Sequence, residues 1–165
     1  MTRLKTDQSL REQVRSLVFD RVIKLRWHPR MDFAPVAMPA DLNLADKVEG
    51  MLLGLAIGDA LGNTSESMNP NIRHGRHGWI ENYLPNYYAQ GRAVGLPSDD
   101  SQLAFWTIEH LLQYGELDPQ RLGELFAQPE RQIFGGGQTT ALALSNIRRG
   151  QPWFRTGSPR ASNGA

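Results

Sequence analysis

Apolar residues in the central part of the chain recur with the period of an α-helix. In and just before the stretch 46–66 they stand three and four positions apart, which places them on one helical face and predicts that this face is buried. They are Leu44, Val48, Met51, Leu52 and Leu55. Glycines recur at every fourth position on a neighbouring stripe, at Gly50, Gly54, Gly58 and Gly62. Because an interior glycine costs a helix about 1 kcal/mol relative to alanine, the stripe predicts close packing against a second helix or a ligand. Gly62 is also placed to end the helix.

Three more helices are predicted after residue 97 by their start and stop signals. The segment from Ser98 to Ser101 opens the first of them, and Gly115 ends it. Its expected apolar face comprises Ala104, Phe105, Ile108, Leu111 and Leu112. The next helix begins at residues 118 and 119, an aspartate cap followed by a proline at the first helical position. The last follows the glycine triplet at 135–137 and runs through Ile147 to a stop at Gly150.

The N-terminal part of the chain predicts a separate amphipathic helix over residues 9–28. Ser9 and Glu12 form a capping box at its start, and Pro29 marks its end. Its apolar face comprises Leu10, Val14, Leu17, Val18 and Leu25. Over residues 1–30, eight basic residues stand against three acidic ones. This excess could serve RNA, DNA or an anionic membrane; alternatively, the helix docks its apolar face on the main domain and solvates its basic face. Residues 31–43 are expected to form a linker.

Residues 67–97 lose the helical pattern and are rich in glycine, proline, asparagine and aromatic residues. An irregular segment of this length in a compact domain is typical of a functional or mobile loop. His74 and His77 have the spacing of a metal-binding pair, but no second pair of matching type follows, so a zinc site is not expected. The aromatic residues could stack on bases or anchor the loop to the protein; they are Trp79, Tyr83, Tyr87 and Tyr88.

The composition excludes some kinds of site chemistry but does not indicate a function. The 165 residues suffice for one domain, and 18 basic residues nearly cancel 17 acidic ones, so no global charge points to nucleic acid or membrane. The absence of cysteine excludes disulfides, thiolate metal sites and cysteine nucleophiles. The sequence contains neither a run of 18 apolar residues nor a hydrophobic N-terminal segment of the signal-peptide kind. We therefore expect a cytoplasmic protein.

Three groups of residues are candidates for a functional site. Asp59 falls on the apolar face of the central helix, either as a core aspartate bonded to a neighbouring helix or as a carboxylate near a metal or substrate. Residues 98–101, with two hydroxyls and two carboxylates, are either a helix cap or a set of hard oxygen ligands for Mg²⁺, Mn²⁺ or Ca²⁺. Residues 135–137 suit a phosphate at a helix N-terminus, although a flexible interhelical turn would look the same and the lysine of a nucleotide P-loop is missing.

Taken together, these segments resemble the ADP-ribosylglycohydrolase family, which includes the dinitrogenase reductase activating enzymes. The segment EGMLLGLAIGDALGNTSE at 49–66 resembles the family's first helix with its trailing glutamate. PSDDSQLAF at 97–105 is similar to the segment that opens a metal-binding helix, with serine in place of threonine at both ends. GGGQTTALA at 135–143 resembles the glycine-rich phosphate loop, and SNGA at 162–165 resembles the start of an asparagine-glycine motif. The resemblance covers residues 46–165.

The resemblance implies an all-α fold with two Mg²⁺ ions that hydrolyses the bond between ADP-ribose and an acceptor such as arginine or serine. Carried over by residue, the metal ligands would be Ser98, Asp99 and Asp100, and the catalytic carboxylates Glu66 and Asp100. Glu66 would lie at the second metal or act on the scissile centre. Asp59 would orient Ser98 or the end of the first helix. The distal side of the ligand would contact Ser162, Asn163 and Gly164, and the diphosphate would contact Gly135, Gly136 and Gly137. The chain would comprise a basic helix and linker over residues 1–43 and the family domain over residues 44–165.

The family completes its metal site with an aspartate-rich motif near the far C-terminus, and the chain ends before such a motif. We therefore expect an N-terminal fragment in which the second metal site is incomplete, the core is open on one side, and little or no activity remains. The implied partners are ADP-ribose or an ADP-ribosylated protein, and a C-terminal segment that completes the site; neither a membrane nor a nucleic acid is expected. Two alternatives stay open: a non-catalytic ADP-ribose or nucleotide binder, and a nucleic-acid or partner-binding module built on the basic N-terminal helix.

Overall fold

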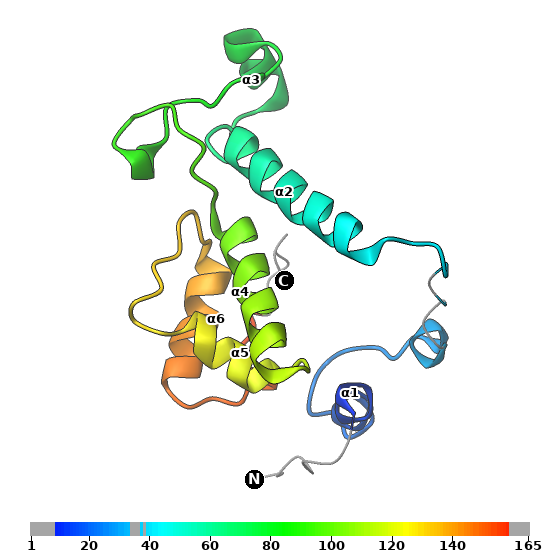
Figure 1. Ribbon diagram of the computed structural model, residues 1–165. Helices are drawn as coiled ribbons and strands as arrows, with labels where there is room; N and C mark the ends of the chain where they lie inside the picture. Colours follow the sequence, from blue (N-terminus) through cyan, green and yellow to red (C-terminus); the bar gives the residue numbers. More distant parts are fainter. Residues whose placement is uncertain (1–8, 34–36, 38, 159–165) are drawn as a thin grey trace.

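The computed structural model describes residues 9–33, 37 and 39–158 of the chain. Within these residues the structure is helical and contains no strand, which confirms the all-α prediction. Figure 1 shows the helices in order: α1 (Leu10–Phe19), α2 (Leu44–Gly62), α3 (Pro70–His77), α4 (Asp99–Tyr114), α5 (Pro119–Phe126) and α6 (Gln138–Arg148). Short 3₁₀ turns follow α1, α3 and α6; they are η1 (Pro29–Asp32), η2 (Tyr87–Ala89) and η3 (Trp153–Arg155).

Helices α4, α5 and α6 form the packed body of the structure, with α5 in contact with both of the others (Figure 1). The backbone of α5 approaches α6 so closely that a Cβ added at Gly123 would lie 2.9 Å from Cδ1 of Ile147. Arg148 fixes the same contact, because its Nε donates a hydrogen bond of 2.8 Å to the carbonyl of Ala127. The predicted start of α5 is confirmed: Asp118 accepts hydrogen bonds from the next two free backbone N–H groups, at Gln120 and Arg121.

A buried histidine joins α4 to α5. The side chain of His110 is 0% exposed, and its Nε2 accepts a hydrogen bond of 3.1 Å from the backbone N–H of Asp118. The ring packs against Tyr114 with centroids 4.8 Å apart. Periodicity does not reveal this residue, because the predicted apolar face of α4 lies elsewhere: Phe105, Leu111 and Leu112 are exposed. The buried side of α4 instead carries polar residues, Ser101 and His110.

We expect His110→Phe to lower the free energy of unfolding by about 1 kcal/mol, because the part-buried Asp118 N–H would lose its acceptor while ring packing is kept. Guanidinium unfolding followed by circular dichroism measures the change. The matched control is His74→Phe, since His74 is exposed on α3 and should change stability by less than about 0.5 kcal/mol. Equal stability of the two variants would contradict this role for His110.

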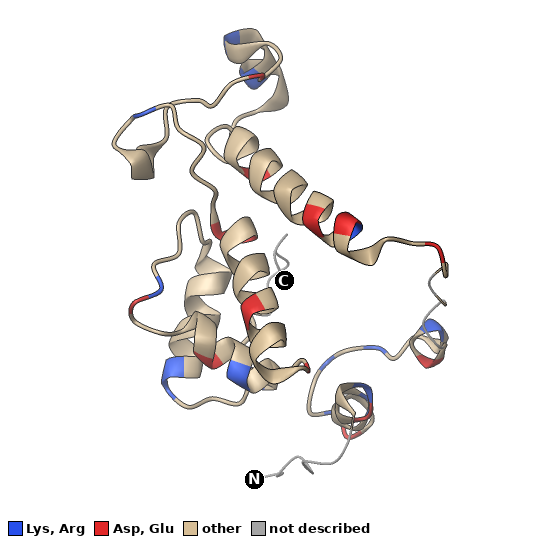
Figure 2. Cartoon of the chain, viewed as in Figure 1, with Lys and Arg blue, Asp and Glu red and all other residues tan. Residues whose placement is uncertain are grey.

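The predicted apolar face of α2 is largely uncovered. The helix ends at Gly62, where a stop was predicted, but Leu44, Val48 and Met51 are exposed, and a Cβ added at Gly50, Gly54, Gly58 or Gly62 would meet nothing within 4 Å. The prediction of close packing along the glycine stripe is therefore wrong for this structure. The physical reason is that, among the described helices, extensive packing on α2 comes from α4 alone. Figure 2 shows the charges of α2 concentrated near its N-terminal end, which leaves the rest of the helix nearly free of charge.

The N-terminal helix is shorter than its pattern predicts. The capping box at Ser9 and Glu12 is present, but α1 ends at Phe19 rather than near residue 28. Arg21 adopts a left-handed conformation with φ of 55°, and the N–H of Val22 donates to the carbonyl of Leu17 at 2.9 Å. These are the features of a Schellman motif, which stops a helix by satisfying its last carbonyls. The sequence does not reveal this helix end, because the left-handed position of the motif is usually occupied by glycine and here is Arg21.

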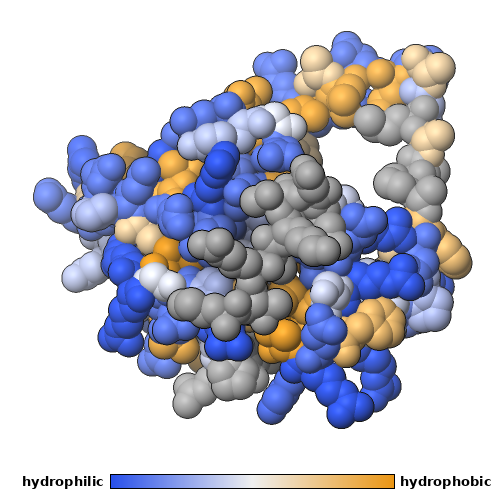
Figure 3. All heavy atoms as spheres, turned by 90° about the horizontal axis from the view of Figure 1, so that it is seen from below, coloured by the Kyte–Doolittle hydropathy of each residue, from blue (hydrophilic) through white to orange (hydrophobic). Residues whose placement is uncertain are grey.

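The apolar residues of the N-terminal segment do not form one buried face. Leu17 is buried, whereas Phe19, Leu25 and Phe33 are exposed, and Figure 3 shows apolar side chains lying among polar ones on the face seen from below. Part of the excess of basic residues is neutralised within the segment. The guanidinium groups of Arg11 and Arg15 lie 3.8 and 3.7 Å from Oδ1 of Asp32.

Residues 67–97 are more ordered than an irregular loop, because they contain α3 and η2. Trp79 and Tyr87 are 87% and 88% exposed, so these two rings do not anchor the segment.

None of the helices in the described part of the chain is long and apolar enough to cross a membrane.

Candidate functional site

Asp59 joins the end of α2 to the start of α4. Its Oδ1 accepts a hydrogen bond of 2.6 Å from the Ser98 hydroxyl, and its Oδ2 accepts one of 2.7 Å from the Ser101 hydroxyl. Oδ2 also accepts from the backbone N–H groups of Ser98 at 2.7 Å and Ser101 at 3.3 Å. Burial raises the pKa of Asp59, but these four hydrogen bonds outweigh it and hold the pKa below its ordinary value. The expected contact between Asp59 and Ser98 is therefore present.

The hydroxyl of Ser98 consequently does not cap α4. It makes no side-chain hydrogen bond to the first turn of the helix, and its single proton is donated to Asp59. The oxygen keeps its lone pairs, which remain able to accept a hydrogen bond or bind a cation. The reading of residues 98–101 as a simple helix cap is thus not supported for Ser98.

Three carboxylates gather around this joint: Glu66, just beyond α2, and Asp99 and Asp100 in the first turn of α4. Burial raises the pKa of Glu66, and the negative charges of Asp100, Asp99 and Asp59 raise it further. The pKa of Asp99 is raised by burial and then by the charge of Asp100. Among the described residues no lysine or arginine forms an ion pair with these carboxylates. The cluster therefore carries negative charge that a bound cation would stabilise.

A side chain of α4 positions the glycine-rich loop above this cluster. The side-chain amide of Gln102 makes two hydrogen bonds to the backbone that precedes the loop. Its Nε2 donates to the carbonyl of Gln132 at 2.9 Å, and its Oε1 accepts from the N–H of Phe134 at 2.8 Å. Gly135 then turns the chain with φ of +81°, a conformation that favours glycine. A Cβ at Gly135 would lie 3.2 Å from Oδ1 of Asp99. The loop and the acidic cluster are thus in direct contact, although they are far apart in the sequence.

An aromatic residue of η2 contacts the same loop. The backbone N–H of Gly135 donates a hydrogen bond of 3.1 Å to the Tyr88 hydroxyl, and the Tyr88 ring packs on Phe134 with centroids 5.2 Å apart. Tyr88 is held by Asn86, whose Oδ1 accepts from the Tyr88 N–H at 2.8 Å. Asn86 is buried and donates to Asn63 at 3.3 Å, and Asn63 in turn reaches Asp59 at 3.4 Å. A polar network therefore connects the aromatic loop to the helix joint.

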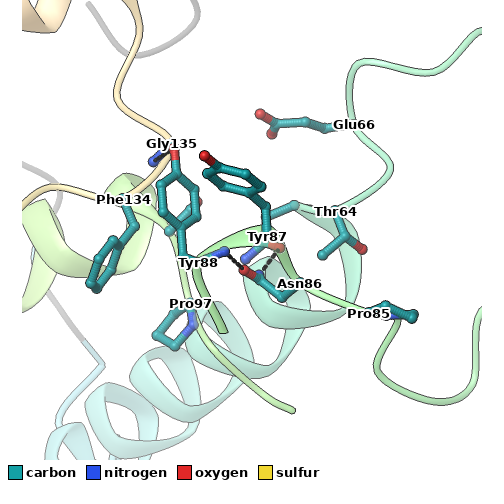
Figure 4. A pocket seen from close by; sticks show the side chains of 11 residues that line it. Thr64, Glu66, Pro85, Asn86, Tyr87, Tyr88, Pro97, Phe134 and Gly135 are labelled. Carbon is teal, nitrogen blue, oxygen red and sulfur yellow. Dashed lines mark hydrogen bonds between the residues drawn. The ribbon is translucent and has the colours of Figure 1, made fainter. Parts of the chain in front are cut away.

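A pocket of about 250 Å³ lies between these segments (Figure 4). Glu66 and Thr64 line it from the end of α2, Tyr87 and Tyr88 from η2, and Gly135 from the glycine loop. The Thr64 hydroxyl is buried and has no hydrogen-bond partner among the described residues. The pocket thus offers carboxylate, hydroxyl, amide and aromatic groups to a polar ligand that contains a ring.

Sequence reasoning identified part of this site. The structure brings together Glu66, Ser98, Asp99, Asp100 and Gly135, whereas Ser162, Asn163 and Gly164 lie outside the described residues. The sequence pattern did not identify Asn63, Asn86 or Gln102 as parts of the site, nor the contact of Tyr88 with Gly135. Asparagine is typical of helix ends and turns, so the local roles of Asn63 and Asn86 could be predicted. Their long-range hydrogen-bond partners correspond to no pattern in the sequence.

The fit of this site to a metal ion is partial. Within the described part of the chain, no three histidine, aspartate or glutamate side chains converge closely enough to hold a metal ion. The chemistry of the donor set is nevertheless suited to Mg²⁺, since carboxylate and hydroxyl oxygens are its preferred ligands and no basic side chain of the described segments pairs with them.

Comparison with known sequences identifies the class of protein. The sequence model described as ADP-ribosylglycohydrolase matches residues 40–165. A protein of Archaeoglobus fulgidus is 33% identical over 119 residues, which cover 69% of this chain and 38% of the relative. The YegU protein of Escherichia coli strain K12 is 30% identical over 133 residues, or 73% of this chain and 39% of the relative. Both relatives are described as uncharacterized. No solved structure matches significantly.

The chain belongs to the ADP-ribosylglycohydrolase family. It spans about two fifths of the length of the curated relatives that it matches. The match begins at residue 40, so α1 and η1 precede the family domain.

Proposed function

We propose that the described site belongs to a metal-dependent hydrolase that removes ADP-ribose from a modified acceptor. The observation that carries the proposal is the contact between the acidic start of α4 and the glycine loop, where a Cβ on Gly135 would lie 3.2 Å from the Asp99 carboxylate. A diphosphate on the loop and a cation on the carboxylates would then be neighbours, and their opposite charges would stabilise each other.

Each group has a role that follows from its chemistry. Ser98, Asp99 and Asp100 would hold Mg²⁺, which would polarise the ribose oxygens and favour attack by water. Glu66 lines the pocket, and burial together with the neighbouring carboxylates raises its pKa, which is the direction that makes a carboxyl group a better general acid or base. Asp100 would assist as a second carboxylate at the same end of α4. Asp59 would act by orienting Ser98, and the backbone of residues 135–137 would hold the diphosphate at the start of α6.

Titration calorimetry of ADP-ribose into the purified chain tests this proposal, with and without Mg²⁺. We expect binding that depends on Mg²⁺ and weakens at least tenfold in Asp99→Ala and Asp100→Ala, because each variant removes a charged ligand of the cation. Glu116→Ala is the matched control, since Glu116 is an exposed acid beyond the far end of α4 and should leave affinity unchanged. Affinity that is the same in all three variants would refute the assignment of the acidic residues.

A second candidate is a non-catalytic ADP-ribose binder. The absence of a three-residue metal cluster among the described residues favours it. It predicts ADP-ribose binding that is unchanged by Mg²⁺ or by chelation with EDTA. The same titrations therefore distinguish the two candidates.

A further inference from the structure

The glycine loop brings a backbone donor to the point where it meets the acidic cluster. Gly135 is the residue at which the loop turns, and its N–H points to the Tyr88 hydroxyl at 3.1 Å (Figure 4). A phosphate on this loop would need backbone N–H groups of this kind, because they are the donors that bind anions at a helix N-terminus. The Tyr88 oxygen thus stands where an oxygen of the ligand would stand.

The position of Tyr88 is determined by contacts independent of that hydrogen bond. Its backbone N–H is held by Asn86, and its ring contacts Phe134 and Tyr87 at centroid distances of 5.2 and 5.4 Å. The short loop that carries it is closed by a bridge between Asn86 and Arg92. Removal of the hydroxyl would therefore leave the ring and the loop in place.

The hydroxyl can nevertheless leave Gly135 at small cost. Tyr88 is 48% exposed, so water can replace the Gly135 N–H as the partner of its hydroxyl. A hydrogen bond in such a place contributes a net stabilisation of about 0.5–1.5 kcal/mol. The contact is strong enough to compete with a ligand and weak enough to be displaced by one.

We propose that Tyr88 sets the affinity of the glycine loop for phosphate by occupying the Gly135 N–H until the ligand displaces it. This inference rests on the proposed function, because it takes the diphosphate of ADP-ribose as the competing group. The free energy of the Tyr88–Gly135 hydrogen bond is subtracted from the free energy of ligand binding. Loss of the hydroxyl alone should therefore tighten binding.

The test compares the wild type with Tyr88→Phe by calorimetric titration of ADP-ribose in the presence of Mg²⁺. We expect the variant to bind roughly threefold to tenfold more tightly, the factor that corresponds to the net strength of one hydrogen bond. The control is Tyr114→Phe, since Tyr114 lies at the far end of α4 and its hydroxyl makes no hydrogen bond to a described residue. Amide hydrogen exchange should also be faster at Gly135 in Tyr88→Phe and unchanged in the control.

The outcomes separate this inference from the proposed function. Equal affinity of the wild type and Tyr88→Phe would overturn the role of Tyr88 and leave the proposed function standing. Weaker binding by Tyr88→Phe would also overturn it, because the hydroxyl would then contact the ligand instead of competing with it. Absence of ADP-ribose binding in all three folded proteins would overturn both proposals.

Discussion

Replacement of Asp59 by alanine should lower the free energy of unfolding by about 3 kcal/mol or more. The substitution removes the acceptor of four hydrogen bonds from Ser98 and Ser101 at once. Ser101 is fully buried and Ser98 nearly so, so their donors would stay without partners in the folded state. Each buried donor left unsatisfied costs about 1–3 kcal/mol. Denaturation by guanidinium, followed by circular dichroism at the helical band, measures the loss.

Two further variants make the Asp59 prediction specific. Glu49→Ala removes an exposed acid from the same helix and should change stability by less than about 0.5 kcal/mol. Ser101→Ala combined with Asp59→Ala should cost less than the sum of the single changes, because residues in one hydrogen-bond network are coupled. Additive effects, or a loss below about 1 kcal/mol for Asp59→Ala, would contradict the structure of the joint.

Gly135→Ala should destabilise the protein by about 2 kcal/mol and weaken ADP-ribose binding. An L-residue in the left-handed region costs roughly 1–2 kcal/mol, and φ at Gly135 is +81°. The new Cβ would also lie 3.2 Å from both Oδ1 of Asp99 and Cβ of Ser98, so either the loop or the acidic residues must shift. Unfolding experiments measure the first effect, and calorimetric titration with ADP-ribose measures the second.

The control for the stability of this loop is Gly137→Ala. Gly137 has φ of −74°, and a Cβ there would meet nothing within 4 Å. Its replacement should therefore cost less than about 1 kcal/mol, mainly through the cap of α6. If the two variants were equally stable, the close approach of Gly135 to Asp99 would not exist in solution.

The sequence predicted the helices whose ends are marked by local chemistry. Asp118 and Pro119 start α5 as expected, and Gly115 ends α4 in a left-handed conformation with φ of 73°. Such signals work because capping involves residues only a few positions apart. The failure at Arg21 has the same basis, since the Schellman bonds are present but the residue that usually indicates them is not.

Burial and side-chain partners were predicted less well, because both depend on what lies across space. The period of α2 predicted one buried face, but Leu44, Val48 and Met51 on that face are exposed, because burial is decided by whether another element covers the face. For the site, the placement of Asp59 on that face indicated a buried partner, and family resemblance indicated Ser98. No period or spacing could have paired Gln102 with Phe134, or Tyr88 with Gly135, over separations of 32 and 47 residues.

The joint at Asp59 restricts how this site can diverge in sequence. One carboxylate on α2 accepts from two hydroxyls that stand one helical turn apart around the start of α4. A change of serine to threonine keeps the hydroxyl, whereas a change to alanine at either position leaves a carboxylate oxygen without that partner. Substitutions at positions 59, 98 and 101 should therefore occur together. The direction in which α4 presents its acidic residues depends on the same three positions.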